Sequence, residues 1–527
     1  MKKLFLFAIS LGFLIAIACT DLSQIAGSPS AVPTFDPGLL KTMIVNTADA
    51  AFTQTALHAT PTFTATPTFV NEISPTVTST PSSGSFKPGD PTATPLGSDI
   101  TDPDFIAGLQ AFNDEDYEQV ITLMSEVITR DPDLAPPYRY RGIAYLSFNQ
   151  CDESLADFNQ ALSINPDYAY AWAGHAMANR CLGNEMQKLL DFQKALSLDP
   201  SLAFVHHNLG VDYFNDGNYE KSLEEYSLAV AIDPNRAGAW SGKAEALFKL
   251  GRYQECIENA SKALEVDPTE WLAYSDRAFC KDFMGDFAGA IPDYKMYIDN
   301  SGDAGASYWY NLGLAQRKME DYDSAIASYT KALELDPEYY EAYINRGYVY
   351  RLQKKYSKAL TDYSQALEFG EILTAYSGRG DTYYESEEYN KAIEDYKKVL
   401  QINPSDAHAY CYISLSYFEL KKYQDSIDAA EASHSIDAGC GGRQLLETEA
   451  RSYYALKNYD QALVFINKAL ALGEYPLGLY YRGMIHQAAG KNQEAIQDLE
   501  TFLSLPETED LPQEKADAKA RLAKLKK

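Results

Sequence analysis

A repeated Asp-Pro or Asn-Pro pair is the feature that most constrains the fold of this chain. Proline disfavours helical geometry in the residue before it, so each pair predicts the end of a helix. The pairs recur at 34-residue intervals and return after two longer gaps: Asp131-Pro132, Asn165-Pro166, Asp199-Pro200, Asp233-Pro234, Asp267-Pro268, Asp336-Pro337 and Asn403-Pro404. We therefore expect one structural unit to be copied along most of the chain.

Residues 306–339 show what this unit contains. Apolar residues recur three and four positions apart from Trp309 to Leu314 and again from Ala325 to Leu335, which indicates two short amphipathic helices. The polar residues 320–323 between them indicate a turn. The unit is therefore predicted to be a helical hairpin, and a single hairpin cannot bury its apolar face without neighbours.

The small residues of this unit indicate how the two helices meet. Gly313 and Ala325 allow the backbones to approach, while Trp309, Leu312 and Tyr329 fill the space around them. Trp-x2-Leu-Gly in the first helix, Ala-x3-aromatic in the second and a terminal Pro together resemble the tetratricopeptide repeat. This resemblance implies an all-α, right-handed superhelical solenoid.

Alignment of the second-helix signature predicts twelve repeats over residues 101–509. The two longer gaps each leave room for a repeat that lacks the Pro, near Gly302 and Glu371. Residues 510–527 are expected to form a last helix, with Leu522 and Leu525 on one face, that caps the final repeat.

The first residues indicate export. Met1-Lys2-Lys3 and a 15-residue apolar run are typical of a signal peptide at 1–18, because the run is too short to span a bilayer. Cys19 follows Ala16-Ile17-Ala18 and resembles the lipidated cysteine of bacterial lipoproteins, although Ala-x-Ala also suits ordinary signal cleavage. We expect a protein anchored by lipid to the outer face of the bacterial cell membrane.

Residues 19–100 differ in composition from the repeats. They are rich in Pro, Thr and Ser and carry few charged residues. Such a segment has too little apolar surface to offset the entropy lost on ordering. We therefore predict a disordered tether between the lipid and the repeats, with glycosylation of its Thr residues left open.

The net charge is −29, and the acidic residues are concentrated in the repeats. Such a surface repels nucleic acid and anionic membranes, so the lipid is expected to be the only membrane contact. Solubility is the favoured interpretation of this charge, with recognition of basic polypeptides as the alternative. We found no catalytic or phosphate-binding motif, and the 7 His residues are scattered. We expect neither enzyme activity nor a cofactor or metal.

Six cysteines lie within the repeats, and export would permit their oxidation. Taken in order along the chain, each two successive cysteines fall on neighbouring elements of the expected fold. We therefore predict disulfides between Cys151 and Cys181, Cys256 and Cys280, and Cys411 and Cys440. Buried thiols are the alternative.

Five repeats carry Arg just before the small residue of the first helix, where the family usually has Leu. Each Arg has an Asp sixteen residues later: Arg141 and Asp157, Arg277 and Asp293, Arg346 and Asp362, Arg379 and Asp395, Arg482 and Asp498. Repeats with Leu or Ile at that place have no Asp, as Ile413 and Ala429 illustrate. We predict an Arg–Asp bridge between the two helices of each such repeat.

The family resemblance implies that polypeptides bind in a concave groove lined by first helices. The residues expected to be exposed there are Asn208, Val211, Phe214, Tyr310, Asn311, Leu314, Arg317, Asn345, Tyr348, Arg351, Asp381 and Tyr384. Asn311 and Asn345 occupy equivalent places and could bracket a peptide backbone. The expected function is a membrane-tethered scaffold for protein or peptide partners. The alternative is a non-catalytic regulatory subunit of an envelope enzyme, such as a cell-wall hydrolase or protease.

Overall fold

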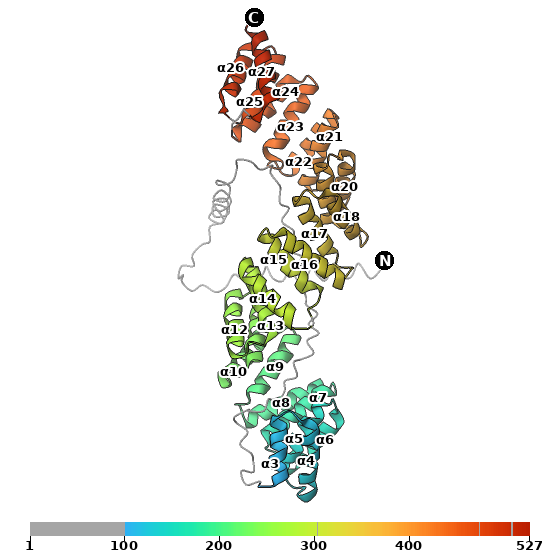
Figure 1. The fold of residues 1–527 in the computed structure, drawn as a ribbon, viewed down its shortest axis with the longest axis vertical. Helices are drawn as coiled ribbons and strands as arrows, with labels where there is room; N and C mark the ends of the chain where they lie inside the picture. The colour runs from blue at the N-terminus through green and yellow to red at the C-terminus, as the bar shows by residue number, and fades with distance from the viewer. Residues whose placement is uncertain (1–100, 303, 474, 507–509) are drawn as a thin grey trace, which may run out of the picture. The chain divides into compact units, whose positions relative to one another are not determined.

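The computed structural model describes residues 101–302, 304–473, 475–506 and 510–527. The expected signal peptide, Cys19 and the tether at 19–100 lie outside these residues. The described part of the chain is all-α and contains 25 helices, labelled α3 to α27 (Figure 1). No helix within it is long and apolar enough to cross a membrane.

The helices alternate as first and second members of hairpins. The first helices are α3 (Pro103–Asn113), α5 (Ala135–Ser147), α7 (Ala169–Cys181), α9 (Ala203–Asn215), α11 (Ala237–Lys249), α13 (Trp271–Phe283), α15 (Ala306–Lys318), α17 (Tyr340–Leu352), α19 (Leu373–Glu385), α21 (Ala407–Glu419), α23 (Gly442–Ala455) and α25 (Pro476–Ala488). The second helices are α4 (Tyr117–Arg130), α6 (Cys151–Ile164), α8 (Glu185–Leu198), α10 (Tyr219–Ile232), α12 (Tyr253–Val266), α14 (Phe287–Asn300), α16 (Tyr322–Leu335), α18 (Tyr356–Leu367), α20 (Tyr389–Ile402), α22 (Tyr423–Ile436), α24 (Tyr459–Ala471) and α26 (Asn492–Ser504). The last helix is α27 (Pro512–Leu525).

Each first helix packs against the second helix of its own hairpin, and each second helix packs against the next first helix. The predicted series of helical hairpins is therefore confirmed. Consecutive first helices also contact one another, as α11 does α13, α15 does α17 and α17 does α19. We call the surface formed by these first helices, α9 to α21, the first-helix face.

A residue in the left-handed region makes the turn within each hairpin. Glu320 has φ 59° and Lys354 has φ 57°, and glycines such as Gly251 hold the same place in other repeats. In the hairpin of α15 and α16, Asp321 follows and its side chain accepts a hydrogen bond from the backbone N–H of Ser324. The turn reverses the chain and caps the second helix at once.

Close approach of the helices explains the glycines that lie against aromatic rings of the second helices. A Cβ built on Gly313 would lie 2.7 Å from Cε1 of Tyr329, so only hydrogen fits there. Tyr226 lies in the same way between Gly210 of its own hairpin and Gly242 of the next. The aromatic rings of the second helices therefore join successive repeats and form much of the core.

The Asp-Pro turns between repeats are fixed to the first helix that follows. The indole Nε1 of Trp172 donates to the carbonyl of Pro166 at 2.8 Å, and Trp240 donates to the carbonyl of Pro234 at 2.9 Å. The aspartate accepts from the backbone two residues later, as Asp199 does from Ser201 N–H at 2.9 Å. These hydrogen bonds hold the chain in the turn and so explain why each second helix ends at the predicted Asp-Pro or Asn-Pro pair.

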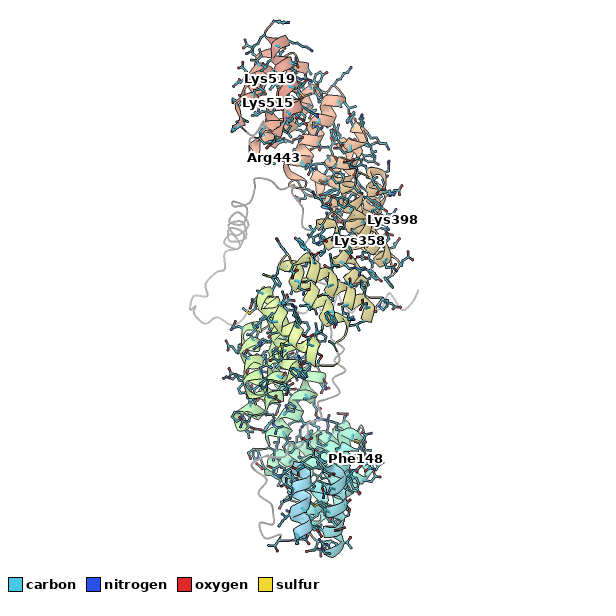
Figure 2. All side chains as sticks on the ribbon, in the orientation of Figure 1. Phe148, Lys358, Lys398, Arg443, Lys515 and Lys519 are labelled. Atoms are coloured by element: carbon cyan, nitrogen blue, oxygen red, sulfur yellow. A yellow bond between two sulfur atoms is a disulfide. The ribbon has the colours of Figure 1, made fainter. Side chains whose placement is uncertain are left out.

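The last helix covers the end of the final hairpin, as expected. Ala518 and Leu522 are buried in the cluster that includes Phe502, and Leu525 packs beside them. Tyr480 donates from its hydroxyl to Asp517 at 2.8 Å. Lys519 on the opposite side is exposed (Figure 2). This helix therefore presents a polar outer surface where the next repeat would otherwise pack.

Candidate functional site

All five Arg–Asp bridges predicted from the sequence are present. In Arg346 and Asp362 the Nε–Oδ2 and Nη2–Oδ1 distances are both 2.8 Å, so the pair is bidentate. Asp362 is only 5 % exposed. Burial raises the pKa of Asp362, while the Arg346 guanidinium acts in the opposite direction. The prediction of a bridge between the two helices of one hairpin is confirmed.

Each of these arginines has a second partner, which was not predicted from the sequence. Nη1 of Arg346 donates to Thr330 Oγ1 at 2.9 Å, and Thr330 belongs to the second helix of the preceding repeat. The equivalent acceptors elsewhere are Ser125, Ser261, Ser364 and Asn467. A short polar residue fifteen or sixteen positions before each Arg is the signal that would have revealed this contact. The arginines therefore link repeats as well as helices.

The predicted binding residues meet most closely between α15 and α17. Asn345 Nδ2 donates to the Tyr310 hydroxyl at 3.0 Å, which joins the two helices directly. The ring of Tyr348 has Arg317 and Arg351 over it, each at 5.3 Å from its centroid. Tyr310, Arg317, Asn345 and Tyr348 are all partly exposed. We call these four residues the α15–α17 patch.

Four of the residues expected to be exposed are buried, which corrects that expectation. Asn208 is 2 %, Asn311 3 %, Arg351 7 % and Asp381 9 % exposed. Their places on the first helices point toward the neighbouring repeat instead of into solvent. The amide nitrogen of Asn311 is enclosed without a hydrogen-bond partner among the described residues. Asn311 and Asn345 are therefore not an equivalent exposed pair.

Internal contacts explain the burial of the other three. Asn208 donates to the Phe204 carbonyl at 2.8 Å and accepts from Arg180 at 2.5 Å. Arg351 binds Glu385 at 2.5 Å and lies 3.5 Å from Asp381. Asp381 also accepts a hydrogen bond from the Tyr396 hydroxyl at 2.7 Å. These side chains hold adjacent repeats together.

The remaining four predicted residues are partly exposed but largely used in packing. Val211 packs beside Tyr226, and Leu314 packs in the cluster around Tyr329. Phe214 lies 5.3 Å from Tyr219 between ring centroids, and Tyr384 lies 5.2 Å from Tyr412. Much of the aromatic content of the chain is therefore structural.

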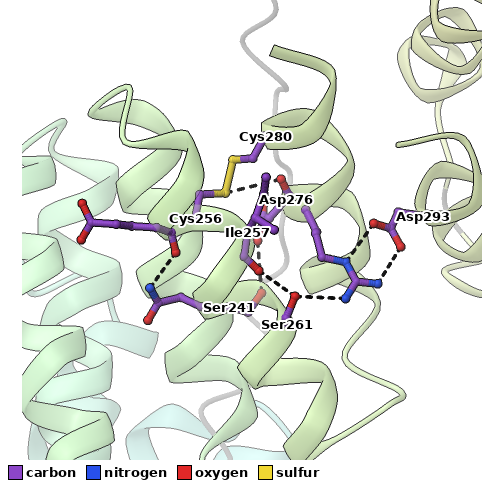
Figure 3. The surroundings of a disulfide bond; sticks show 10 residues. Ser241, Cys256, Ile257, Ser261, Asp276, Cys280 and Asp293 are labelled. Atoms are coloured by element: carbon purple, nitrogen blue, oxygen red, sulfur yellow. Dashed lines mark hydrogen bonds and ion pairs between the residues drawn. A yellow bond between two sulfur atoms is a disulfide. The ribbon is translucent and has the colours of Figure 1, made fainter. Parts of the chain in front are cut away.

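The structure contains two of the three expected disulfides. Cys151, at the start of α6, is bonded to Cys181, at the end of α7, with Cα atoms 5.8 Å apart. Cys256 of α12 is bonded to Cys280 of α13, with Cα atoms 6.4 Å apart (Figure 3). Each bond joins two successive repeats. In the bridge of Cys256 and Cys280 both residues are fully buried.

The third expected disulfide is absent, which corrects that prediction. Cys411 and Cys440 are both buried and both thiols. Cys440 lies just after α22, close to Cys411 of α21 and to Ser433. The hydrogen bond from Cys411 is the largest cause that lowers the pKa of Cys440, to about 6. A hydrogen-bonded thiol pair therefore takes the place of the bridge.

An open hollow of about 860 Å³ runs along α18 and is lined by residues that include Tyr356, Leu360, Ser364 and Glu388. None of the predicted binding residues lines it. Within the described ranges, no group of three or more His, Cys, Asp or Glu side chains is placed to hold a metal ion.

Comparison with protein-family models finds the tetratricopeptide repeat at several places in the chain. One such model matches residues 237–270, 306–339 and 340–369, and a second matches 203–236. A further model, described as TPR repeat, matches residues 380–426. The comparison with curated proteins finds no match.

The chain also resembles several solved structures, two of which are described as TPR proteins. The C-terminal part of a TPR repeat-containing protein from Cytophaga hutchinsonii is 20% identical, with 44% of this chain and 95% of that chain covered and a TM-score of 0.40. YrrB, described as a TPR protein with an unusual peptide-binding site, is 22% identical, with 34% and 92% covered and a TM-score of 0.32. The Cut9–Hcn1 hetero-tetramer structure is 14% identical, with 80% and 95% covered and a TM-score of 0.38.

The family matches coincide with the helical hairpins of the structure. They fall on α9 to α12, on α15 to α18 and on α19 to α22, and the same hairpin continues on both sides of them. The sequence signature and the observed helix pairs therefore agree along the chain. This protein is a tetratricopeptide-repeat protein.

Proposed function

We propose that this protein is a membrane-tethered scaffold that binds a polypeptide on its first-helix face, at the α15–α17 patch. The observation that carries the proposal is the arrangement of Tyr310, Asn345 and Tyr348 on two first helices that contact each other. Their rings and amide are partly exposed, yet they are held in place by contacts within the fold. A rigid surface of this kind loses little entropy when a partner binds.

The chemistry of the patch suits an extended peptide. Tyrosine supplies broad contact area at low entropic cost, and it can donate a hydrogen bond at its hydroxyl. Arg317 lies against Tyr348 and leaves donors for a backbone carbonyl or a carboxylate of the partner. The membrane tether remains part of the proposal on sequence grounds: Cys19 would carry the lipid, and residues 20–100 would separate the repeats from the membrane.

Site-specific crosslinking in intact cells tests the binding surface. A photoreactive phenylalanine analogue would replace Tyr348 on the first-helix face, and Lys358, an exposed residue of α18 labelled in Figure 2, would be the control position. We expect one dominant polypeptide adduct from position 348 and not from position 358. Equal adducts from both positions, or adducts from position 358 alone, would contradict the proposed surface.

The tether has its own test. Cys19→Ser removes the acceptor for lipid and is expected to move the protein from the membrane fraction to the soluble fraction of the same cells. Cys151→Ser, which leaves Cys19 unchanged, is the matched control and should remain with the membrane. Persistence of the Cys19→Ser variant in the membrane fraction would show that lipid on this residue is not the anchor.

A further inference from the structure

Two carboxylates on adjacent first helices form no ion pair with any side chain in the described part of the chain. Glu245 of α11 and Asp276 of α13 are both partly exposed on the first-helix face. Neither forms an ion pair with any described residue, and the only hydrogen bond that the Asp276 carboxylate accepts from a described side chain is that of Ser241 Oγ at 3.2 Å. Asp276 and Ser241 are labelled in Figure 3, beside the bond of Cys256 and Cys280.

Several other acidic residues of the first helices are paired with cationic side chains. Asp212 on α9 is bound by Arg180 at 2.7 Å and by Lys188 at 3.0 Å. Asp381 on α19 has Arg351 and His408 as partners. Compared with these, Glu245 and Asp276 lack a positive partner. Removing a carboxylate from water without pairing it with a cation costs free energy of folding. A cationic group bound here would offset that cost.

The hydroxyl of a buried tyrosine, Tyr226, lies at the same place. Tyr226 of α10 is 4 % exposed, and its ring passes between Gly210 and Gly242, with its hydroxyl end at Gly242 of α11. Gly242 lies three residues before Glu245, so both face the same side of α11. No described residue forms a hydrogen bond with the Tyr226 hydroxyl. A group with several N–H donors would satisfy this oxygen together with the two carboxylates.

The electrostatics agree with this geometry. Burial raises the pKa of Glu245 to about 7, and burial followed by the charge of Glu245 raises the pKa of Asp276. Lys249 acts weakly in the opposite direction on both groups. Burial is also the main cause that raises the pKa of Tyr226, followed by the charges of Glu245 and Asp276. A cation placed among these oxygens would lower all three pKa values.

We propose that Glu245, Asp276 and the Tyr226 hydroxyl form a subsite that binds a basic side chain, arginine or lysine, of the polypeptide held on the first-helix face. The subsite is built rigidly, because the disulfide of Cys256 and Cys280 fixes α13 against α12 and the Cys256 sulfur lies 3.6 Å from the Asp276 carbonyl. A guanidinium group matches two carboxylates best, since it presents donors in a fixed fork. This inference names the partner chemistry of the proposed function and rests on it.

The test uses a short probe instead of the natural partner. Calorimetry would measure binding of an acetylated pentapeptide amide, Gly-Ser-Arg-Ser-Gly, and of the same peptide with neutral citrulline in place of Arg. We expect the Arg peptide to bind to the full chain at least tenfold more tightly than the citrulline peptide. Binding at pH 7 should also release protons, because the cation lowers the pKa of Glu245.

Matched variants separate the subsite from general attraction to an acidic protein. Glu245→Gln/Asp276→Asn should weaken the Arg peptide at least tenfold. Glu258→Gln/Glu265→Gln removes the same charge from exposed places on α12 and should leave binding unchanged. The carboxylates of Glu245 and Asp276 form no ion pairs that their amides would break. The variant Glu245→Gln/Asp276→Asn should therefore keep the helical circular dichroism of the parent and have a melting temperature at pH 8 that is no lower.

The outcomes distinguish this inference from the proposed function. The subsite would be overturned if both double variants lost the same affinity for the Arg peptide, or if the Arg and citrulline peptides bound equally well. If crosslinking at position 348 finds a partner while the peptide is insensitive to Glu245 and Asp276, only the subsite is wrong. If the peptide result holds and no partner crosslinks at position 348, the subsite is supported and the α15–α17 patch is not the binding surface.

Discussion

The bridge between Arg346 and Asp362 gives the sharpest quantitative prediction. Asp362 has a side chain only 6% exposed, whereas that of Arg346 is 16% exposed. Arg346→Ile would leave a buried carboxylate alone, which we expect to destabilise α17 and α18 by about 3–5 kcal/mol. Asp362→Ala would cost less, about 2 kcal/mol, because Arg346 keeps its hydrogen bond to Thr330 and reaches solvent more easily.

The double variant should be milder than the first single variant. Arg346→Ile/Asp362→Ala reproduces the apolar pair that the chain already uses at Ile413 and Ala429, both buried. We expect the two changes to be coupled by at least about 2 kcal/mol. Thr330 keeps its hydrogen bond to the Ile326 carbonyl at 2.7 Å, so no buried hydroxyl is left alone.

Native-state hydrogen exchange is the appropriate assay. A long repeat array does not unfold as one cooperative unit, so a single denaturation midpoint would mix several hairpins. Exchange of the amides in α17 and α18 reports the free energy of their own opening. Additivity of the two single changes within about 0.5 kcal/mol would refute a direct bridge. A mild effect of Arg346→Ile alone would refute the burial argument.

Three further predictions concern other parts of the fold. Lys354→Gly should stabilise the hairpin of α17 and α18 by about 0.5–1 kcal/mol, because residue 354 has φ 57°; exchange rates of these helices should fall, and a rise would contradict the argument. The contribution of the His434–Glu449 pair to the stability of α22 and α23 should fall as the pH rises from about 6 to 8, since the hydrogen bond to Glu449 raises the pKa of His434 and burial raises that of Glu449, so the folded state binds more protons at this pair than the unfolded one. The lowered pKa of Cys440 acts in the opposite direction in parent and variant alike, so the pair is measured as the difference in exchange between the parent and His434→Gln; a difference that stays constant across this range would exclude the pair. Alkylation of the denatured, unreduced protein followed by peptide mapping should label Cys411 and Cys440 and spare Cys151, Cys181, Cys256 and Cys280; labelling of all six would contradict both disulfides.

The hairpin fold could be predicted because its causes are local and repeated. Each Asp-Pro turn ends a helix whatever surrounds it, and a glycine such as Gly313, which lies against Tyr329, allows the two helices to approach closely. The Arg–Asp bridges could also be found, since the two residues vary together from repeat to repeat. The partner at Thr330 was missed because it belongs to a different repeat, so its role depends on how two hairpins pack.

The candidate site was harder to predict for a related reason. Asn208, Arg351 and Asp381 were expected to face a partner, but they face the next repeat. Which side chains are buried depends on the small rotation between successive hairpins, and this rotation cannot be predicted from the sequence pattern. The same rotation brings together Glu245 and Asp276, which are 31 residues apart in the chain. In the case of Cys411 and Cys440 proximity was predicted correctly, and the redox state was not.

The most direct test of the central claim is a comparison of hydrogen exchange with and without the partner captured by crosslinking. The claim is that a polypeptide binds across the first helices. We predict that α11, α13, α15 and α17 gain protection in the complex, whereas the exposed sides of α12, α16 and α18 do not. Protection confined to the second helices, or to α27, would contradict the account.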